Sequence, residues 1–258
     1  MLDEIIRQSL LFIGTFAANL FASVSGGGAG FVQFPLLILL GLPFASALGS
    51  HKVAVVFLGI GALTKQRRMH GQFIFDRQVA LIMTVLCSPA VISGSLIIVK
   101  VPTQQAEIIL GGITVAAGIY SLLKKGFGSK CIETRSLMRT LLGTLCMITV
   151  GMFSGSLSSG AGLFATLTLV GIFGLDLKSA ILHTMVFVAT IWNAVGAVTI
   201  GMVAPIHWQW IPTMIIATLM GSYIGTSLLI KMPVRGVKVI FSLVAILSGF
   251  TLIYTALR

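Results

Sequence analysis

The chain has 258 residues, of which 57% are apolar and only 9% are charged. Soluble domains carry about 25% charged residues, so this composition excludes an ordinary soluble fold. A net charge of +11 would indicate nucleic-acid binding in a soluble protein, but here the basic residues flank apolar runs. Because those runs are continuous rather than alternating, they predict an all-α polytopic membrane protein. The lipid bilayer is its expected partner, and no nucleic-acid partner is expected.

Ten apolar segments follow one another, at about 6–24, 29–42, 45–64, 78–99, 104–123, 137–157, 161–175, 179–200, 208–230 and 236–257. Most are long enough to span a hydrocarbon core of ~30 Å, which takes about 20 residues. Segments 29–42 and 161–175 reach only about 21–23 Å as helices. Each follows a Gly/Ser cluster, SGGGAG at 25–30 and SGSLSSGAG at 154–162. The sequence therefore predicts a pair of short helices, each beginning at a break.

A weak internal repeat accompanies the paired breaks. Three pairs of blocks align at offsets of 131 to 133 residues: GAGFVQFPLLILLG at 28–41 with GAGLFATLTLVGIFG at 160–174, ASALGSHK at 45–52 with KSAILHTM at 178–185, and GSLIIVKVP at 94–102 with GTSLLIKMP at 225–233. We therefore predict a first repeat, 1–126, and a second, 127–258, that together form one membrane domain. Each repeat holds five segments. Because five is an odd number of crossings, the second repeat is expected to lie in the membrane in the opposite orientation to the first.

The basic residues support this inversion. Alternating spans place the loops 65–77, 124–139, 175–178 and 231–238 on one side, and these loops hold 13 of the 17 Lys and Arg residues. Loop 201–207, the repeat equivalent of 65–77, has none. Because cytoplasmic loops of membrane proteins are enriched in Lys and Arg, we expect a multi-pass protein of the cell (inner) membrane with both termini outside.

Paired, glycine-interrupted segments in inverted repeats are typical of the substrate site of a secondary transporter. A helix that begins inside the membrane presents free N–H groups and the positive end of its dipole. Gly26, Gly27 and Gly28 would let a ligand approach such N–H groups closely, because glycine has no Cβ. The alternative is that these glycines only allow helices to pack tightly.

Ionisable residues within membrane spans are rare and mark functional sites; here they are His51, Lys52 and His183, with Glu107 near a span end. In the aligned repeats, Ser50-His51 corresponds to His183-Thr184. Capping or snorkelling at the interface is the alternative role for these side chains. Because the spans otherwise lack carboxylates, the expected ligand is an anion. Any proton dependence is expected to run through His51 or His183, without a requirement for Na⁺.

The segments SGGGAGFVQFPLLILLG and ASALGSHKVAVVF, with LSSGAGLFATLTLVGIFGLDLKSAILHT in the second half, resemble the sulfite exporter TauE/SafE family of anion permeases. The resemblance covers nearly the whole chain. It implies secondary transport of a small sulfur-containing anion such as sulfite or an organosulfonate. It also implies that Gly26 to Gly28 and Ser158, Ser159 and Gly160 are the two signature breaks. Family members often show Thr-Ser near the third segment of each repeat, where this chain has Gly49-Ser50-His51-Lys52 and His183-Thr184.

Together these arguments predict substrate binding near the membrane midplane, at the N-terminal ends of the broken helices. The predicted binding residues are Ser25, Gly26, Gly27, Gly28, Ser50, His51, Lys52, Ser158, Ser159, Gly160, His183 and Thr184. No catalytic residue, metal or cofactor is expected, and a homodimer is an open alternative. Two other functions are also open. One is a passive anion channel, and the more remote one is an intramembrane serine protease with a nucleophile in FSGSLSSG and His183 as its base.

Overall fold

The computed structural model describes residues 2–70, 75–97, 103–129, 132, 135–156 and 160–257. These residues form helices joined by turns, with no strand among them, which confirms the all-α prediction. The elements are α1 (Leu2–Ser25), α2 (Ala29–Leu39), α3 (Phe44–His70), α4 (Arg77–Leu81), η1 (Ile82–Leu86), α5 (Cys87–Ile97), α6 (Thr103–Leu123), α7 (Leu137–Ser156), α8 (Ala161–Gly171), α9 (Leu177–His183), η2 (Thr184–Trp192), α10 (Asn193–Gly201), α11 (Ile211–Lys231) and α12 (Val234–Ala256).

Helix length separates the spanning helices from the short ones. Within the described ranges, 7 helices are long and apolar enough to cross a membrane. The helices α2 and α8 have 11 residues each, which corresponds to about 16 Å. Both end earlier than the predicted 42 and 175, at turns that contain Gly41 with φ 100° and Gly174 with φ 72°. Glycine in the left-handed region commonly follows a helix end, so these turns stop the short helices before the apolar run is finished.

Two stretches of π-helix were not predicted. The stretches η1 and η2 interrupt the fourth and eighth apolar segments, and Trp192 in η2 donates a hydrogen bond of 2.7 Å from Nε1 to the Met83 carbonyl in η1. Apolar periodicity over so few residues does not distinguish a π turn from an α turn. Such turns are frequent at functional sites in other proteins. Here η2 follows His183, one of the predicted site residues.

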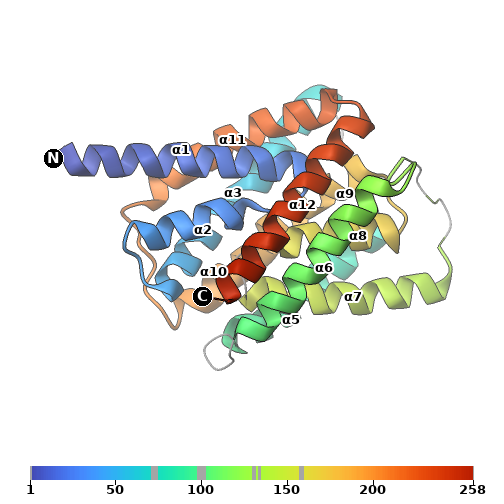
Figure 1. The fold of residues 1–258 in the computed structure, drawn as a ribbon, viewed down its shortest axis with the longest axis horizontal. Coiled ribbons are helices and arrows are strands. Elements are labelled where there is room, and N and C mark those ends of the chain that lie inside the picture. The colour runs from blue at the N-terminus through green and yellow to red at the C-terminus, as the bar shows by residue number, and fades with distance from the viewer. Residues whose placement is uncertain are drawn as a thin grey trace.

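The helices pack in pairs. In Figure 1, α6 and α12 run side by side, while α1 lies along α11 and α7 lies against α5. Glycines bring the last two pairs close together. A Cβ on Gly225 of α11 would lie 2.5 Å from the Leu20 carbonyl oxygen of α1, and a Cβ on Gly94 of α5 would collide with the Met152 carbonyl oxygen of α7. Small residues at such contacts are the usual means of close helix packing in membranes.

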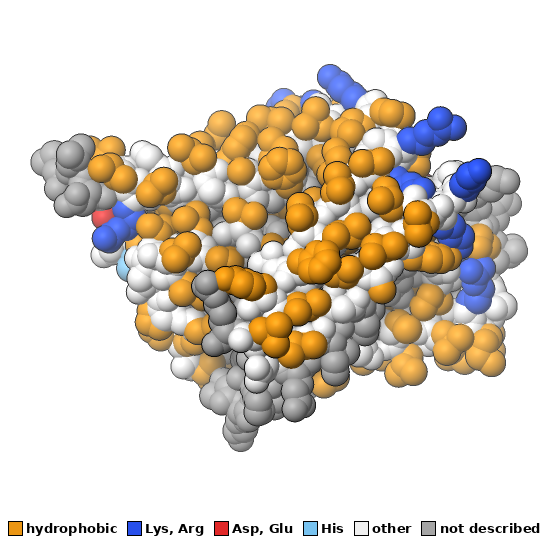
Figure 2. Space-filling model, in the orientation of Figure 1, with side chains coloured by type: hydrophobic (Ala, Val, Ile, Leu, Met, Phe, Trp, Pro, Cys, Tyr) orange, Lys and Arg blue, Asp and Glu red, His pale blue; other side chains and the backbone are white. Residues whose placement is uncertain are grey.

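Basic side chains mark one end of the molecule. Figure 2 shows hydrophobic side chains over much of the visible face and Lys and Arg gathered at the end away from the N-terminus. Contacts join the helix termini there. Lys238 at the start of α12 donates to the carbonyl of Lys124 beyond α6, and Arg68 near the end of α3 bonds to Tyr223 of α11. We call this the basic end. Near the N-terminus, Arg7 pairs instead with Glu4 at 3.6 Å.

Candidate functional site

The two predicted breaks in the backbone meet each other. Gly28 and Gly160 precede α2 and α8 with φ values of 98° and 88°, a region that favours glycine. A Cβ on Gly27 would lie 2.7 Å from the Leu163 nitrogen and 2.8 Å from the Gly162 Cα, so the breaks are in contact backbone to backbone. The glycines therefore serve two purposes at once, a left-handed turn before each short helix and a close crossing between the turns.

A cavity of about 50 Å³ lies where α2 and α8 begin. The first N–H groups of a helix have no acceptor within it, and together with the helix dipole they give this end a partial positive charge. Neither helix start has a side-chain cap. The volume is roughly three to five times what one water needs, which suits a small ion. The described lining residues are Ala22, Gly26, Gly27, Gly28, Ala29, Gly30, His51, Val55, Leu58, Ser154, Gly160, Ala161, Gly162, Thr184, Met185, Val188, Ala189 and Asn193.

His51 reaches this cavity because α2 is short. The chain turns back after α2, and His51 lies two turns into α3, which begins at Phe44. Its Nδ1 is 3.2 Å from Gln33 Oε1, and the same oxygen accepts a 3.3 Å hydrogen bond from Asn19 Nδ2. Asn19 Nδ2 also lies 3.1 Å from Thr218 Oγ1. This buried network joins α1, α2, α3 and α11 and fixes the orientation of the imidazole ring, with Nδ1 as the donor toward the amide oxygen.

A similar polar pair holds the second short helix. The hydroxyls of Thr166 in α8 and Thr184 in η2 lie 2.9 Å apart, and Thr166 Oγ1 bonds to the Gly26 carbonyl at 3.3 Å. Thr184 occupies the position that the repeat alignment gives to His51, and Thr166 lies one residue beyond Ala165, the residue aligned with Gln33. Each short helix is thus tied to the segment that follows it at similar but not identical positions, by different side chains.

Lys52 lies behind the cavity wall rather than on it. Only 1% of this residue is exposed, and its Nζ donates a 2.5 Å hydrogen bond to the carbonyl of Ser154, which lines the cavity. Its stem packs on Gly196, where an added Cβ would lie 3.0 Å from Lys52 Cδ. No described carboxylate pairs with it. Lys52 therefore places a buried amino group, bonded to a backbone carbonyl, beside the cavity wall.

His183 points away from the cavity. Its Nε2 accepts a 2.9 Å hydrogen bond from the Asp76 backbone N–H, and its Nδ1 lies 2.7 Å from the Ser179 carbonyl. Since an amide N–H only donates and a carbonyl only accepts, this arrangement requires the neutral ring with its proton on Nδ1. His183 thus has a partner on each nitrogen, while the next residue, Thr184, lines the cavity.

The Asp76 carboxylate forms an ion pair beside that histidine. It lies 2.7 Å from Arg135, whose side chain is only 9% exposed, and it caps α4 by accepting from the Val79 N–H at 3.0 Å. Partial burial acts to raise the pKa of the Asp76 carboxyl. The hydrogen bond from Val79 and the guanidinium of Arg135 outweigh burial and hold that pKa below its ordinary value.

The structure places only some of the predicted binding residues on the cavity wall. Gly26, Gly27, Gly28, His51, Gly160 and Thr184 line the cavity, whereas Lys52 and His183 have the positions given above. Ser25 closes the end of α1, with Oγ 2.9 Å from the Phe21 carbonyl and 2.7 Å from the Gly27 carbonyl. Ser50 accepts from the His207 N–H at 2.9 Å. Ser158 and Ser159 lie outside the described residues. The binding role of the whole set stays a prediction.

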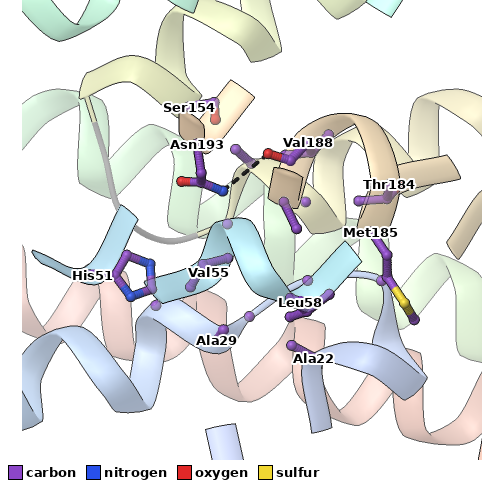
Figure 3. A pocket seen from close by; sticks show the side chains of 18 residues that line it. Ala22, Ala29, His51, Val55, Leu58, Ser154, Thr184, Met185, Val188 and Asn193 are labelled. Atoms are coloured by element: carbon purple, nitrogen blue, oxygen red, sulfur yellow. Dashed lines mark hydrogen bonds between the residues drawn. The ribbon is translucent and has the colours of Figure 1, made fainter. Parts of the chain in front are cut away.

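Sequence reasoning left Asn193 and Ser154 out of the site. Figure 3 shows Asn193 and Ser154 across the cavity from His51 and Val55, with the Asn193 side chain bonded to the Val188 carbonyl at 3.0 Å. A polar residue within an apolar span was the available signal for Asn193. Only the fold could show that this span, rather than another, faces the break.

The chain also matches a known family over most of its length. The model of the family described as sulfite exporter TauE/SafE matches residues 10–252. The chain belongs to the TauE/SafE family. This confirms the resemblance found in the sequence, and it identifies the protein as a multi-pass membrane protein.

Relatives of this TauE/SafE protein carry transporter names. A probable membrane transporter protein, YfcA, of Escherichia coli K12 is 26% identical over 93% of this chain and 86% of its own length. A probable membrane transporter protein of Haemophilus influenzae is 25% identical over 93% and 91%. The probable membrane transporter protein ORF9 of a Sinorhizobium species is 27% identical over 68% and 66%. No solved structure matches the chain. Family and relatives place it among membrane transporters rather than enzymes.

Proposed function

We propose that this TauE/SafE protein is a secondary transporter that binds a small sulfur-containing anion, such as sulfite or an organosulfonate, in the cavity between the two breaks. The observation that carries the proposal is the convergence of the α2 and α8 N-termini on one small cavity. Helix N-termini with exposed backbone N–H groups are anion-binding sites in many folds. The family description supports a sulfur oxyanion as the ligand.

The charges around the cavity also favour an anion over a cation. The described lining includes no Asp or Glu, and the buried ammonium of Lys52 is bonded to the Ser154 carbonyl on the wall. Cation carriers usually have carboxylates in their path. Two helix N-termini and one ammonium would stabilise a bound anion and repel a cation.

The inverted repeats, 1–126 and 127–258, are part of the same proposal. The contact between Gly94 and the Met152 carbonyl, and that between Gly225 and the Leu20 carbonyl, join pairs of residues that the repeat offsets relate. His51 and Thr184 are related in the same way, while Thr166 lies one residue beyond the position aligned with Gln33. Repeats of this kind carry the substrate between the two sides by rocking around a central site.

The same cavity would also serve a passive anion channel. A carrier is distinguished from a channel by flux that saturates with substrate and by counterflow in liposomes. The protease hypothesis has less support, because both ring nitrogens of His183 are engaged by Asp76 and Ser179. A serine protease needs its histidine within hydrogen-bond reach of the nucleophile.

The deciding experiment is sulfite counterflow in proteoliposomes, with sulfate, thiosulfate and short sulfonates as competitors. The informative variant is Lys52→Met, because the aligned residue of the second repeat is Met185. We expect Lys52→Met to weaken anion affinity by about tenfold or more, which corresponds to about 1.4 kcal/mol. The matched control is Lys178→Met, which removes another lysine bonded to a backbone carbonyl, that of Ile230, at the start of α9. Unchanged affinity in Lys52→Met would contradict the proposed role of the ammonium, and absence of sulfite counterflow in wild type would contradict the proposed substrate.

The same liposomes test coupling. The only residues near the breaks with an ordinary pKa close to neutrality are His51 and His183, so we propose that any proton dependence runs through one of them and that Na⁺ is not required. Flux is measured under imposed pH and Na⁺ gradients for wild type, His51→Gln and His183→Gln. A strict Na⁺ requirement, or a pH response that both variants retain, would rule this out.

A further inference from the structure

A second basic site lies at the basic end, away from the anion cavity. A groove of about 870 Å³ runs between the end of α6 and the start of α12. Its cationic lining residues are Lys125, Arg235 and Lys238. The remaining described lining residues are Leu122, Gly126, Phe127, Ser129, Pro233, Val234 and Val239. The groove thus combines a cluster of positive charge with apolar walls.

The groove has a fixed floor. Phe127 is buried, with its ring stacked on that of Phe241 at a centroid distance of 6.4 Å. The turn around it is held on both sides, because Lys238 Nζ donates to the Lys124 carbonyl at 2.9 Å and the Leu177 N–H donates to the Gly128 carbonyl at 2.9 Å. The basic side chains therefore project from a turn and a helix that are packed together, rather than from a loose loop.

Within the part of the chain that the structure describes, no carboxylate balances the charges of the groove. Lys125 and Arg235 are exposed, and none of the described carboxylates pairs with them or with Lys238. The helix α12 begins here after Pro233, so its first N–H groups add partial positive charge. An anionic group placed in this groove would gain charge-assisted hydrogen bonds that the protein itself does not supply.

The position of the groove identifies the source of that anion. It opens where the apolar helix α6 ends and α12 begins, which is the level of the lipid headgroups for membrane helices. Leu122 and Val239 on its walls are exposed, as is Leu243 one turn further along α12. We propose that this groove binds the phosphate of an anionic phospholipid, with the acyl chains lying along α6 and α12. Basic pockets between membrane helices bind such headgroups in other proteins.

The test is native mass spectrometry of the purified full-length protein with equal amounts of phosphatidylglycerol and phosphatidylcholine. We expect wild type to retain phosphatidylglycerol over phosphatidylcholine by roughly tenfold, since basic residues at the headgroup level attract anionic lipid. The variant Lys125→Gln/Arg235→Gln/Lys238→Gln should lose this preference. The matched control, Lys65→Gln/Arg67→Gln/Arg68→Gln, removes the same charge near the end of α3, outside the groove, and should keep it.

Three outcomes would overturn the proposal. Equal loss of the lipid preference in both triple variants would show that diffuse surface charge, rather than the groove, attracts the lipid. Displacement of phosphatidylglycerol by millimolar inorganic phosphate would make the groove a general phosphate site. The single variants Lys125→Gln and Arg235→Gln, each checked for a monodisperse elution profile, should show graded losses, and wild-type retention by both would also contradict the site. None of these readouts depends on transport through the anion cavity.

Discussion

At the scale of single residues, the glycines of the first break meet several demands at once. Gly28 holds a left-handed conformation, and Gly27 has no room for a side chain because the second break crosses it. The tight-packing role and the ligand-approach role are therefore not exclusive. The absence of Cβ atoms brings the two breaks together, and by doing so it brings the α2 and α8 N-termini to one cavity.

Gly27→Ala tests this close crossing. Its Cβ would lie 2.7 Å from the Leu163 nitrogen, so we expect a loss of stability of about 1–3 kcal/mol, as for other overpacked sites. The control is Gly171→Ala in α8, where no atom lies within 4 Å of an added Cβ and stability should be unchanged or slightly higher. Thermal unfolding in detergent measures both. Equal stability of Gly27→Ala and wild type would mean that the breaks do not touch.

The Asp76–Arg135 ion pair predicts a pH dependence of stability. Because the pKa of Asp76 is lowered in the folded state, its contribution is fully present above the unfolded pKa of about 3.9 and is lost as the pH falls through the lower folded pKa. Asp76→Asn should therefore destabilise the protein at pH 7, by about 1–2 kcal/mol for a partly buried pair. The difference from wild type should shrink below about pH 4.

A matched control for this prediction is Asp176→Asn. Asp176 caps α9 through a 3.0 Å bond from the Ser179 N–H, as Asp76 caps α4, but no described arginine or lysine pairs with it. Its replacement should cost less at pH 7, because asparagine is also a good N-cap. Thermal unfolding between about pH 2 and pH 7 gives the comparison, because the folded pKa of Asp76 lies below its unfolded value. A pH-independent difference between Asp76→Asn and wild type would mean that the ion pair does not stabilise the fold.

At the scale of helices, length decides what reaches the site. The 11-residue helices α2 and α8 begin at the cavity, and the chain then returns in α3 and α9. Because α2 and α8 are so short, only two turns of the following helices bring His51 and Thr184 back to the level of the breaks. A full-length span in place of α2 would carry His51 to the membrane surface, where a midplane role would be lost.

Alanine substitutions at the two glycine contacts between helices test whether the proposed repeats pack in the same way. In Gly94→Ala the new Cβ would meet the Met152 carbonyl, and in Gly225→Ala it would meet the Leu20 carbonyl. We expect similar losses of about 1–3 kcal/mol in thermal unfolding from both, because the two contacts join residues at aligned positions of the proposed repeats. Gly112→Ala in α6, with no atom within 4 Å, should be neutral. A loss at one site only would be evidence against equivalent packing.

At the scale of the whole molecule, the distribution of charge predicts the orientation. Lys125 follows Lys124 at the basic end, whereas the turn after α10 contains Met202, which is 79% exposed. In a background without native cysteines, Met202→Cys should react with an impermeant maleimide in intact cells, and Lys125→Cys should react only after the membrane is opened. If both positions react from the same side, the inverted-repeat topology is wrong.

The sequence by itself determined the class of this protein, the ten apolar segments, the paired breaks and the family. These features depend on composition, on run length and on glycine, all of which are local along the chain. Tertiary structure decided which predicted residues face the cavity. It turned His183 toward Asp76 and placed Thr184 on the wall, and it brought Asn193 and Ser154 to the breaks. Neighbouring residues on a helix point about 100° apart, and a π turn changes that angle locally. These membrane helices are apolar on every side. Their sequence therefore does not indicate which side of each helix lines the site.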